Sequence, residues 1–373
     1  MAQGYSLKDQ LFNAEKTRYL AGLFEQVSPE FDAPSFEAQV MSRLLQLELK
    51  ERMAWIATCL EQALPGSLPE VAHTLRAALP PPLDPKRNDD DFGDFIFAPL
   101  GNFVVNAGLE AHANLSLDLL EEITQRFSME WAIRPYLNRW PDLVLARMQG
   151  WAVHPSTHVR RLVSEGTRPR LPWGQGIGLA IEAPLGLLDE MHGDATRYVT
   201  RSVANHLNDI TKKSPDLAMD RLEMWHAQAR QDETELDWMT RHALRGLVKA
   251  GNPRALRMLG FDPEADLQVG LVIRPGKVRI GETLEFKCQV LARQDTPVLV
   301  DYLIHFQRPG GKVSAKVFKL KQAVVQGKTP LVMEKRHKLK GDATTFRLVP
   351  GAHRLEIQVN GVKRAEAAFN LVG

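Results

Sequence analysis

The sequence predicts a mainly α-helical protein, in which a superhelical solenoid of stacked helix pairs precedes a C-terminal immunoglobulin-like β-sandwich. A Val/Met-x-Arg run opens three apolar helical stretches 40 residues apart, at residues 159–161, 199–201 and 239–241. Pro141–Leu143 and Pro215–Leu217 are both Pro-Asp-Leu, and an Arg and a Trp follow each at the same offsets. This period is typical of HEAT-like repeats, helix pairs that stack because no pair can bury its apolar face alone. Near Asp266 the apolar period changes from that of a helix to that of a strand.

Helical periodicity extends from Ser6 to about Leu259. The apolar stripe from Leu44 to Leu60 predicts one long helix, which Leu64-Pro65-Gly66 ends. Residues 80–91 are rich in proline and charge and predict a linker inside the helical half. Helix starts are expected near three prolines, since the first helical turn needs no amide donor there, at Pro141, Pro184 and Pro215.

About seven short strands are expected in the last part of the chain, and their number favours an immunoglobulin-like sandwich. Asn360-Gly361 predicts a tight hairpin. The strands are expected at residues 271–273, 284–290, 298–306, 313–320, 331–339, 353–359 and 365–371. We therefore expect a HEAT-like repeat domain over residues 1–265 and a second domain over residues 266–373.

Charge is divided unevenly between these two parts. Residues 268–373 hold 19 Lys and Arg against 8 Asp and Glu, a net charge of +11, which leaves −9 for the first 267 residues. A basic C-terminal domain attached to an acidic domain predicts a polyanionic partner for the basic domain. The alternative is a basic β-domain that has no such partner.

Cysteine content and hydropathy bear on the compartment. Cys59 and Cys288 lie in different expected domains and form no disulfide framework, which favours a reducing cytoplasm. Residues 1–16 lack the apolar core of a signal peptide, and no stretch approaches the roughly 20 apolar residues of a membrane span. We expect a cytoplasmic protein without membrane contact.

The segment from Ser164 to Gly174, SEGTRPRLPWG, is the densest group of chemically useful residues. A helix should run into Glu165 and break at Gly166, and two prolines then stiffen a segment that ends at Trp173. A flexible connector needs only small polar residues, so two prolines, two arginines and a tryptophan favour a functional role for this segment. The alternative is that the indole of Trp173 only fills a gap between helices.

Two further carboxylates are expected near Glu165. In the 40-residue register Asn205 takes the place of Glu165, and Asp209 lies one turn further along the same helix face. Glu130 is expected on the preceding helix, among apolar residues. For each carboxylate the alternative is a solvated charge at a helix end or an ion pair with a basic neighbour, from among Arg134, Arg161 and Lys212.

Basic residues around these carboxylates would bind phosphates, namely Arg160, Arg161, Arg168, Arg170, Lys212 and Lys213. Carboxylates and an indole inside such a surface make sense if the target within the polyanion is a cation. An N-alkylated base is one, and cation–π contact with Trp173 would contribute about 0.5 to 2 kcal/mol. Carboxylates would stabilise the oxocarbenium-like sugar left by glycosidic cleavage and orient the attacking water.

Other motifs point to no cofactor. His154 and His158 have metal-compatible spacing, but no third ligand follows, and Ser156 favours a capped helix start instead. The glycines of residues 174–178 follow no predicted strand, so they do not indicate a nucleotide fold. We expect neither a metal nor a cofactor.

The motifs SEGTRPRLPWG, SVANHLNDI (202–210) and MEWAIRPYL (129–137) closely resemble the AlkC-type DNA alkylation-repair glycosylases, relatives of the AlkD family. The resemblance covers the helical half, and some members of the group carry a basic immunoglobulin-like domain at the C-terminus. It implies a monofunctional glycosylase in base excision repair that removes 3-methyladenine and plausibly 3-methylcytosine, without metal or cofactor. It also implies that the lesion stays largely stacked, unlike in enzymes that flip the base.

By motif position, the resemblance implies catalytic roles for Glu130, Glu165, Asp209 and Trp173. Trp173 would contact the lesion, Glu165 and Asp209 would stabilise the sugar cation and position water, and Glu130 would support them. The ranking of 3-methyladenine, 3-methylcytosine and 7-methylguanine stays open.

The partner implied is alkylated double-stranded DNA, bound by a monomer that needs no protein partner. We expect the sandwich to help encircle the duplex, with phosphate-facing candidates Lys312, Lys316, Lys319, Lys335, Arg336, Lys338 and Lys340. The alternative is that alternate members of these runs only cover a solvent-facing surface. A non-catalytic HEAT-like scaffold that binds DNA or protein, and a hydrolase of cationic nucleosides, are the rival functions.

Overall fold

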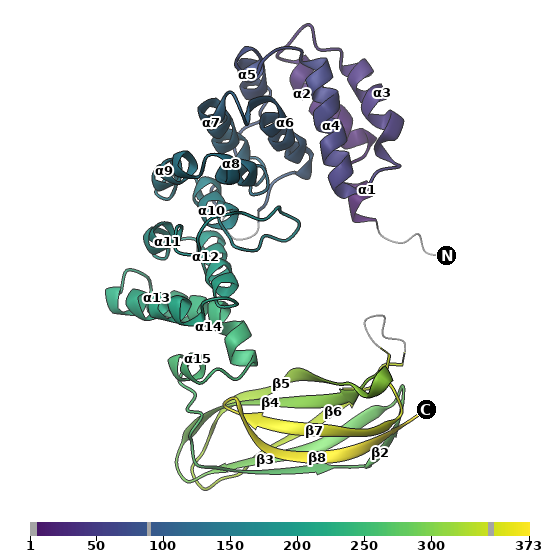
Figure 1. Cartoon of the computed structure of the whole chain (residues 1–373), viewed down its shortest axis with the longest axis vertical. Helices are drawn as coiled ribbons and strands as arrows, with labels where there is room; N and C mark the ends of the chain where they lie inside the picture. The colour runs from purple at the N-terminus through teal and green to yellow at the C-terminus, as the bar shows by residue number, and fades with distance from the viewer. Residues whose placement is uncertain (1–5, 88–90, 342–346) are drawn as a thin grey trace. The chain divides into compact units, whose positions relative to one another are not determined.

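The computed structural model describes residues 6–87, 91–341 and 347–373. The chain divides into two compact units, Met1–Ala243 and Leu244–Gly373. The first unit is built of helices, and the second holds a short helix and all the strands (Figure 1). The predicted fold class, helical repeats followed by an immunoglobulin-like sandwich, is thus confirmed.

Helices of the first unit stack as successive layers along the chain (Figure 1). The helices are α1 Leu7–Leu11, α2 Ala14–Glu25, α3 Ala33–Leu44, α4 Leu49–Ala63, α5 Leu68–Ala77, α6 Ala98–Gly108, α7 Ala113–Thr124, α8 Ile133–Arg139, α9 Pro141–Trp151, α10 Thr157–Gly166, α11 Leu185–Met191, α12 Arg197–Ile210, α13 Pro215–Gln228 and α14 Glu233–Lys249, which crosses the division. A 3-10 turn, η1 Phe95–Phe97, precedes α6. Within the described residues, no helix is both long and apolar enough to cross a membrane.

The 40-residue period corresponds to helix pairs. The three Val/Met-x-Arg runs lie in α10, α12 and α14, and Pro141 and Pro215 are the first residues of α9 and α13. The pairs α9–α10, α11–α12 and α13–α14 are therefore the units that the spacing predicts.

The repeated Pro-Asp-Leu…Arg…Trp pattern is a repeat of contacts. In α9, Arg147 pairs with Asp118 of α7, and the indole nitrogen of Trp151 donates to Glu121 at 2.5 Å. In α13, Arg221 and Trp225 both donate to Asp189 of α11, at 2.7 and 2.8 Å. Each Arg and Trp thus binds an acidic residue on the preceding layer. This pairing lets the buried indoles satisfy their N–H groups.

The expected long helix over residues 44–60 is wrong. α3 ends at Leu44 and α4 begins at Leu49, where Glu48 and Glu51 form a reciprocal capping box. The apolar stripe hides this break because Leu45 continues the pattern although its side chain is 62% exposed. In the expected linker, residues 80–87 form no helix or strand, and residues 88–90 lie outside the described residues.

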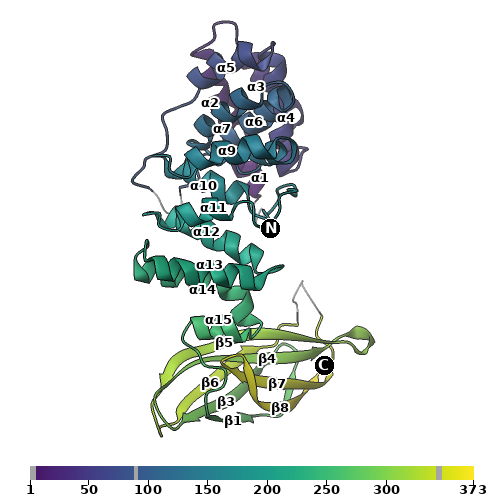
Figure 2. The ribbon, with the colours of Figure 1, turned by 60° about the vertical axis from the view of Figure 1, so that its left-hand side comes forward.

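The strands form two sheets that pack face to face (Figure 2). They are β1 Leu267–Ile273, β2 Lys277–Arg279, β3 Thr283–Ala292, β4 Thr296–Gln307, β5 Val313–Val325, β6 Leu331–Lys338, β7 Gly351–Val359 and β8 Val362–Val372. The sheet orders are β1-β3-β6 and β2-β8-β7-β4-β5. Alternate residues point into one core that includes Leu284, Val300 and Ile357.

Seven of these strands match the expected ones, and the eighth, β2, was missed. β2 has three residues and pairs in parallel with β8, so no alternation in its own sequence reveals it. The expected hairpin is confirmed, since Asn360 and Gly361 both have positive φ (50° and 75°) between β7 and β8.

Helix α15, Pro253–Met258, belongs to the second unit although it precedes the strands. Leu256 and Phe261 pack on Leu299 of β4, and the side-chain amide of Asn360 donates to the carbonyl of Asp262 at 2.8 Å. The compact unit therefore begins at Leu244, whereas the strands begin near the expected boundary.

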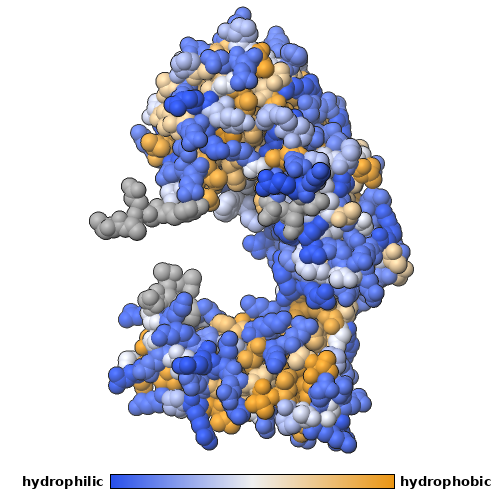
Figure 3. Space-filling model, turned by 180° about the vertical axis from the view of Figure 1, so that it is seen from behind, coloured by the Kyte–Doolittle hydropathy of each residue, from blue (hydrophilic) through white to orange (hydrophobic). Residues whose placement is uncertain are grey.

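Apolar residues also reach the surface of the strand unit, in places on the face seen in Figure 3. Exposed large apolar residues on its strands or beside them are Val272, Val313, Val324, Val332 and Val362. Scattered single valines are ordinary for a sandwich surface and by themselves mark no site.

We predict that a fragment of residues 244–373 is more stable than one of residues 266–373. Removing α15 takes Leu256 and Phe261 from the core, and burial of each contributes about 1.5 to 3 kcal/mol. Urea unfolding of both fragments measures the difference. Equal midpoints would place the unit boundary at the first strand instead.

Candidate active site

Three elements bring the predicted carboxylates together. Glu165 lies on the last turn of α10, and Asp209 lies on the last turn of α12. Glu130 lies in the turn three residues before α8, so its expected place on a helix is wrong. The backbone amide of Ile133 donates to the carbonyl of Met129 at 3.1 Å and closes the turn, and the Ser128 hydroxyl donates to Oε2 of Glu130 at 2.8 Å.

Glu165 is buried, with 5% of its surface exposed, and both carboxylate oxygens have partners. Oε1 accepts from Arg168 at 2.7 Å and lies 3.6 Å from Nη2 of Arg161. Oε2 accepts from the Ser202 hydroxyl at 2.5 Å. Ser202 is on α12, so this bond joins the two stacked helices.

Arg168 links Glu165 to Asp209. Its Nε and Nη2 donate to Oδ2 of Asp209 at 2.9 and 2.8 Å, while Nη1 holds Glu165. The other oxygen of Asp209, Oδ1, accepts from Lys212 at 2.7 Å. The side chain of Asp209 is only 3% exposed, whereas that of Lys212 is 48% exposed.

Arg161 extends the network to Glu130. Its Nη1 donates to Oε2 of Glu130 at 2.9 Å and to the Ser128 hydroxyl at 3.0 Å. Its guanidinium lies over the rings of Tyr198 and Phe92, 4.8 and 5.3 Å from their centroids. Phe92 reaches this position from the segment that precedes α6.

The pKa shifts of Glu165 and Arg168 both favour the charged forms of these side chains. Burial raises the pKa of Glu165, but Arg161 and Arg168 outweigh that effect, so its pKa lies below the ordinary value of 4.5. Burial lowers the pKa of Arg168 and the two carboxylates raise it, with a net increase. Glu165 is therefore ionised at neutral pH.

Three of the basic residues that were expected to bind phosphates pair with the carboxylates instead. Arg161, Arg168 and Lys212 pair with Glu130, Glu165 and Asp209, which is the ion-pair alternative. Unpaired buried carboxylates would be too costly, and basic partners within the same layers remove that cost.

His206 lies on α12 beside the network and contacts α10. Its Nδ1 lies 3.1 Å from the carbonyl of Ser164, and burial lowers its pKa to about 4. The ring is therefore neutral at pH 7 and adds no charge beside Arg168. Its Nε2 is buried without a partner among the described residues.

Trp173 lies in a separate hollow. Its indole is 60% exposed and its φ is +62°, a left-handed conformation. With Trp131, Met53 and Asn102 it lines a cavity of about 190 Å³ between α4, α6 and the loop. The loop that follows α10 thus carries Arg168 into the carboxylate network and Trp173 into this hollow.

The other basic candidates of the first unit differ in how accessible their side chains are to a DNA phosphate. Arg160 donates to Asp194 at 2.5 Å and to the carbonyls of His154 and Pro155, so its contacts are structural. Arg170 and Lys213 are exposed. Only the exposed candidates have the access that phosphate binding requires.

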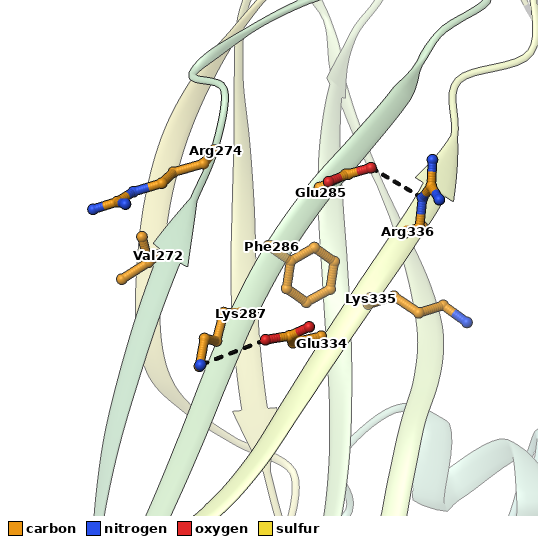
Figure 4. A pocket seen from close by; sticks show the side chains of 8 residues that line it. All are labelled: Val272, Arg274, Glu285, Phe286, Lys287, Glu334, Lys335 and Arg336. Atoms are coloured by element: carbon orange, nitrogen blue, oxygen red, sulfur yellow. Dashed lines mark ion pairs between the residues drawn. The ribbon is translucent and has the colours of Figure 1, made fainter.

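The seven basic candidates of the sandwich do not share one face. Arg336 and Lys338 pair with Glu285 and Thr283 on the outer side of the β3–β6 ladder, and Lys335 pairs with the core residue Phe286. Figure 4 shows Arg336 in an ion pair with Glu285, and Lys335 pointing away from that pair. The same hollow holds a second pair, Lys287 with Glu334.

On β5, Lys316 and Lys319 also point to opposite sides, since they pair with Ile304 and Asp301 of β4. Lys312 and Lys340 are exposed beyond the strand ends. Burial lowers the pKa of His337 most, and the charges of Lys335 and Lys316 lower it further. Both lysines therefore lie near His337, at one edge of the sandwich.

Several network residues were missed from sequence. Ser128, Ser202 and Phe92 are partners of the charged groups but carry no signal of their own. Ser202 could have been found, because residues 202, 206 and 209 share one face of α12. Among the described residues, no group of three His, Cys, Asp or Glu side chains could hold a metal, and His154 lies 3.4 Å from Glu121.

Comparison with known proteins places this geometry in context. Residues 268–373 match the family model described as "Uncharacterised protein YhaZ, C-terminal Ig-like domain". YhaZ of Bacillus subtilis is 31% identical over 97% of this chain and 98% of its own length. A solved structure, Pseudomonas fluorescens alkylpurine DNA glycosylase AlkC bound to DNA containing an abasic site analog, is 31% identical and superposes with a TM-score of 0.85. That match covers 99% of this chain and all of the other.

We predict that Glu165→Gln destabilises the protein by about 1.5 to 3 kcal/mol at pH 7, because it removes the anion that Arg161 and Arg168 share and leaves them only Glu130 and Asp209. The folded pKa of Glu165 is depressed, so its stabilising effect is present above pH 4.5 and is lost as pH falls through the folded pKa. Urea unfolding of both proteins should show a difference that shrinks below pH 4.5. A difference independent of pH would contradict an ionised Glu165.

Proposed function

Since the chain belongs to the AlkC family, which includes YhaZ of Bacillus subtilis, we propose that it is a DNA glycosylase that removes cationic alkylated bases. The observation that carries this proposal is the buried network of Glu130, Glu165 and Asp209, in a chain that matches an alkylpurine DNA glycosylase over 99% of its length.

The reaction is hydrolysis of the N-glycosidic bond. The bond between C1′ and the base nitrogen breaks, and its electron pair leaves with the base, which thereby loses its positive charge. The sugar becomes an oxocarbenium-like cation, and a water oxygen then bonds to C1′ while a carboxylate accepts the proton. The products are a neutral base and an abasic site, and the chain makes no covalent bond to DNA.

Carboxylates suit this reaction only as anions. Arg161 and Arg168 hold Glu165 ionised and fix its direction, so no reorganisation is needed when the sugar charge develops. Arg168 fixes the direction of Asp209 through Oδ2. Glu165 and Asp209 stabilise the cation and position water, and Glu130 supports them through Arg161.

Lys212 is the partner of Asp209 that DNA can remove. It is half-exposed, and its ammonium neutralises Oδ1 of an otherwise buried carboxylate. A phosphate beside the lesion attracts Lys212 and leaves Oδ1 facing the reacting sugar. The network thereby gains net negative charge when substrate is bound.

Trp173 presents an exposed indole to the lesion nucleotide, where a cationic base gains about 0.5 to 2 kcal/mol from the ring. A contact with an exposed ring fits a lesion that stays largely stacked in the duplex. The substrates are 3-methyladenine and, with the same charge, 3-methylcytosine.

Phosphate contacts come from cations in both units, which are exposed in the first unit and half-buried in the sandwich. In the first unit these are Arg170 and Lys213, together with Lys212 once it leaves Asp209. In the sandwich, Lys316 and Lys335 share one edge and form the strongest pair of candidates. The protein acts as a monomer, without a cofactor or an obligate protein partner.

We predict that Glu165→Gln and Asp209→Asn each lower release of 3-methyladenine from alkylated duplex DNA at least about a hundredfold, because each removes a fixed anion. DNA affinity should change little. Trp173→Ala should lower release less, because cation–π contact contributes only part of the lesion binding.

The matched control is Asp194→Asn, which breaks the buried pair with Arg160 outside the network. It should reduce stability and leave base release unchanged. No base release by the wild-type protein would favour the non-catalytic scaffold and end the proposal.

We further predict that the double substitution Lys316→Ala/Lys335→Ala weakens duplex binding and makes the negative slope of log K against log salt shallower by about 2. Fluorescence anisotropy at several salt concentrations measures this slope. Lys287→Ala/Lys363→Ala, which removes two ion-paired lysines from other strands, is the control. A slope that the control changes equally would exclude a specific role for this edge.

A further inference from the structure

We infer that Arg134 is a positioning residue, which sets the loop after α10 so that Arg168 and Trp173 reach their sites. This inference rests on the proposed function for its effect on catalysis, but its structural part stands alone. Arg134 lies in the first turn of α8 and is fully buried.

The hydrogen bonds of Arg134 go to backbone carbonyls. Its Nη1 donates to the carbonyls of Gly166 and Arg168 at 2.9 and 3.0 Å, and its Nε donates to the carbonyl of Gln175 at 2.5 Å. Among the residues that the structure describes, no carboxylate pairs with it. One guanidinium therefore ties both ends of the loop to α8.

Arginine suits this task better than lysine. Its planar fork offers donors in fixed directions, so three carbonyls can be held at once. Burial, and then Arg168, lower the pKa of Arg134, while Glu130 and Asp209 raise it, so its charge lies close to the network. Burial of this guanidinium costs folding free energy, so its hydrogen bonds to the loop must offset that cost.

Gly166 lets the loop approach α8. A Cβ at this position would lie 2.6 Å from Cγ2 of Ile133, so any larger residue would push the loop away from the helix. The glycine of the Glu-Gly-Thr-Arg motif and the arginine of the Ala-Ile-Arg-Pro motif are thus two halves of one contact.

The rest of the loop is also held from outside. Lys50 of α4 donates to the carbonyl of Trp173, and the indole nitrogen of Trp131 donates to that of Pro172 at 3.4 Å. Asn138 of α8 binds the carbonyl of Gly176 and the amide of Gly178, at 3.0 and 2.9 Å. These contacts hold Trp173 in a left-handed conformation that costs a non-glycine residue roughly 1–2 kcal/mol.

The test compares Arg134→Lys with Arg52→Lys. Arg52 is the matched control, because it is also fully buried and also binds carbonyls, those of Lys8, Phe12 and Leu47, but it lies in the first helices. Both variants should lower the melting temperature. Hydrogen exchange of residues 166–178 should be at least about tenfold faster in Arg134→Lys only.

Base release separates positioning from simple loss of stability. Arg134→Lys should lower kcat for release of 3-methyladenine about tenfold or more while KM changes less than about threefold, since a small displacement of catalytic groups affects the chemical step. Arg52→Lys should leave both values unchanged at a temperature where it is folded. Equal effects of the two variants on exchange and kcat would overturn the inference.

Asn138→Ala covers the case in which Arg134→Lys does not fold. Asn138 is exposed, and its substitution frees only the far end of the loop, so faster exchange of residues 174–178 and a smaller fall in kcat are expected. Asn106→Ala, which loses one exposed bond to Glu61, is its control and should change neither. If Asn138→Ala also changes neither, the loop is not held from α8 and the inference fails.

The two proposals fail in different ways. A wild-type protein that releases no base refutes the glycosylase function, while the exchange data still decide whether Arg134 positions the loop. Normal release by Arg134→Lys with unchanged exchange refutes the positioning role alone.

Discussion

The bridge that Arg168 makes between Glu165 and Asp209 is the interaction on which the site depends. It spans two stacked helix pairs, because Glu165 is on α10 and Asp209 is on α12. Charges buried this deeply are tolerated only when each has a partner with good geometry. Stacking of the repeats brings the two carboxylates within reach of the Arg168 guanidinium. That guanidinium in turn holds the two helix layers together.

A network of balanced charge resolves a conflict in the proposed substrate. DNA is a polyanion, and unpaired carboxylates would repel it, yet a cationic base and its sugar need anions nearby. Arg161, Arg168 and Lys212 balance the three carboxylates in the free protein. Because Lys212 alone of these three is substantially exposed, it is the one that a phosphate can withdraw. Under the proposed function, the anions are preorganised by their partners and act on the sugar where DNA draws Lys212 away.

The site has two parts that one loop connects. The carboxylates lie between helices, while Trp173 lies in a hollow with Trp131 on the side of α4 and α6. Helix α8 and its preceding turn hold this loop through Trp131, Arg134 and Asn138. Under the proposed function, this loop takes the place of the deep pocket that base-flipping enzymes use.

The sequence by itself determined the order of the two folds, the 40-residue helix pairs, seven of the eight strands and the motif positions of Glu130, Glu165, Asp209 and Trp173. The fold features are local or periodic, so apolar spacing and turn residues specify them, whereas the catalytic roles of the four site residues are what the motif resemblance implies. The break between α3 and α4 and strand β2 escaped prediction, because a leucine continued the apolar pattern in one case and pairing with β8 creates the strand in the other. Only the tertiary structure decided that Arg161 and Arg168 pair with the carboxylates, that Arg160 is structural and that Trp173 stands apart. These outcomes depend on which side chains from different layers meet, and spacing along one chain carries no information on distances between layers.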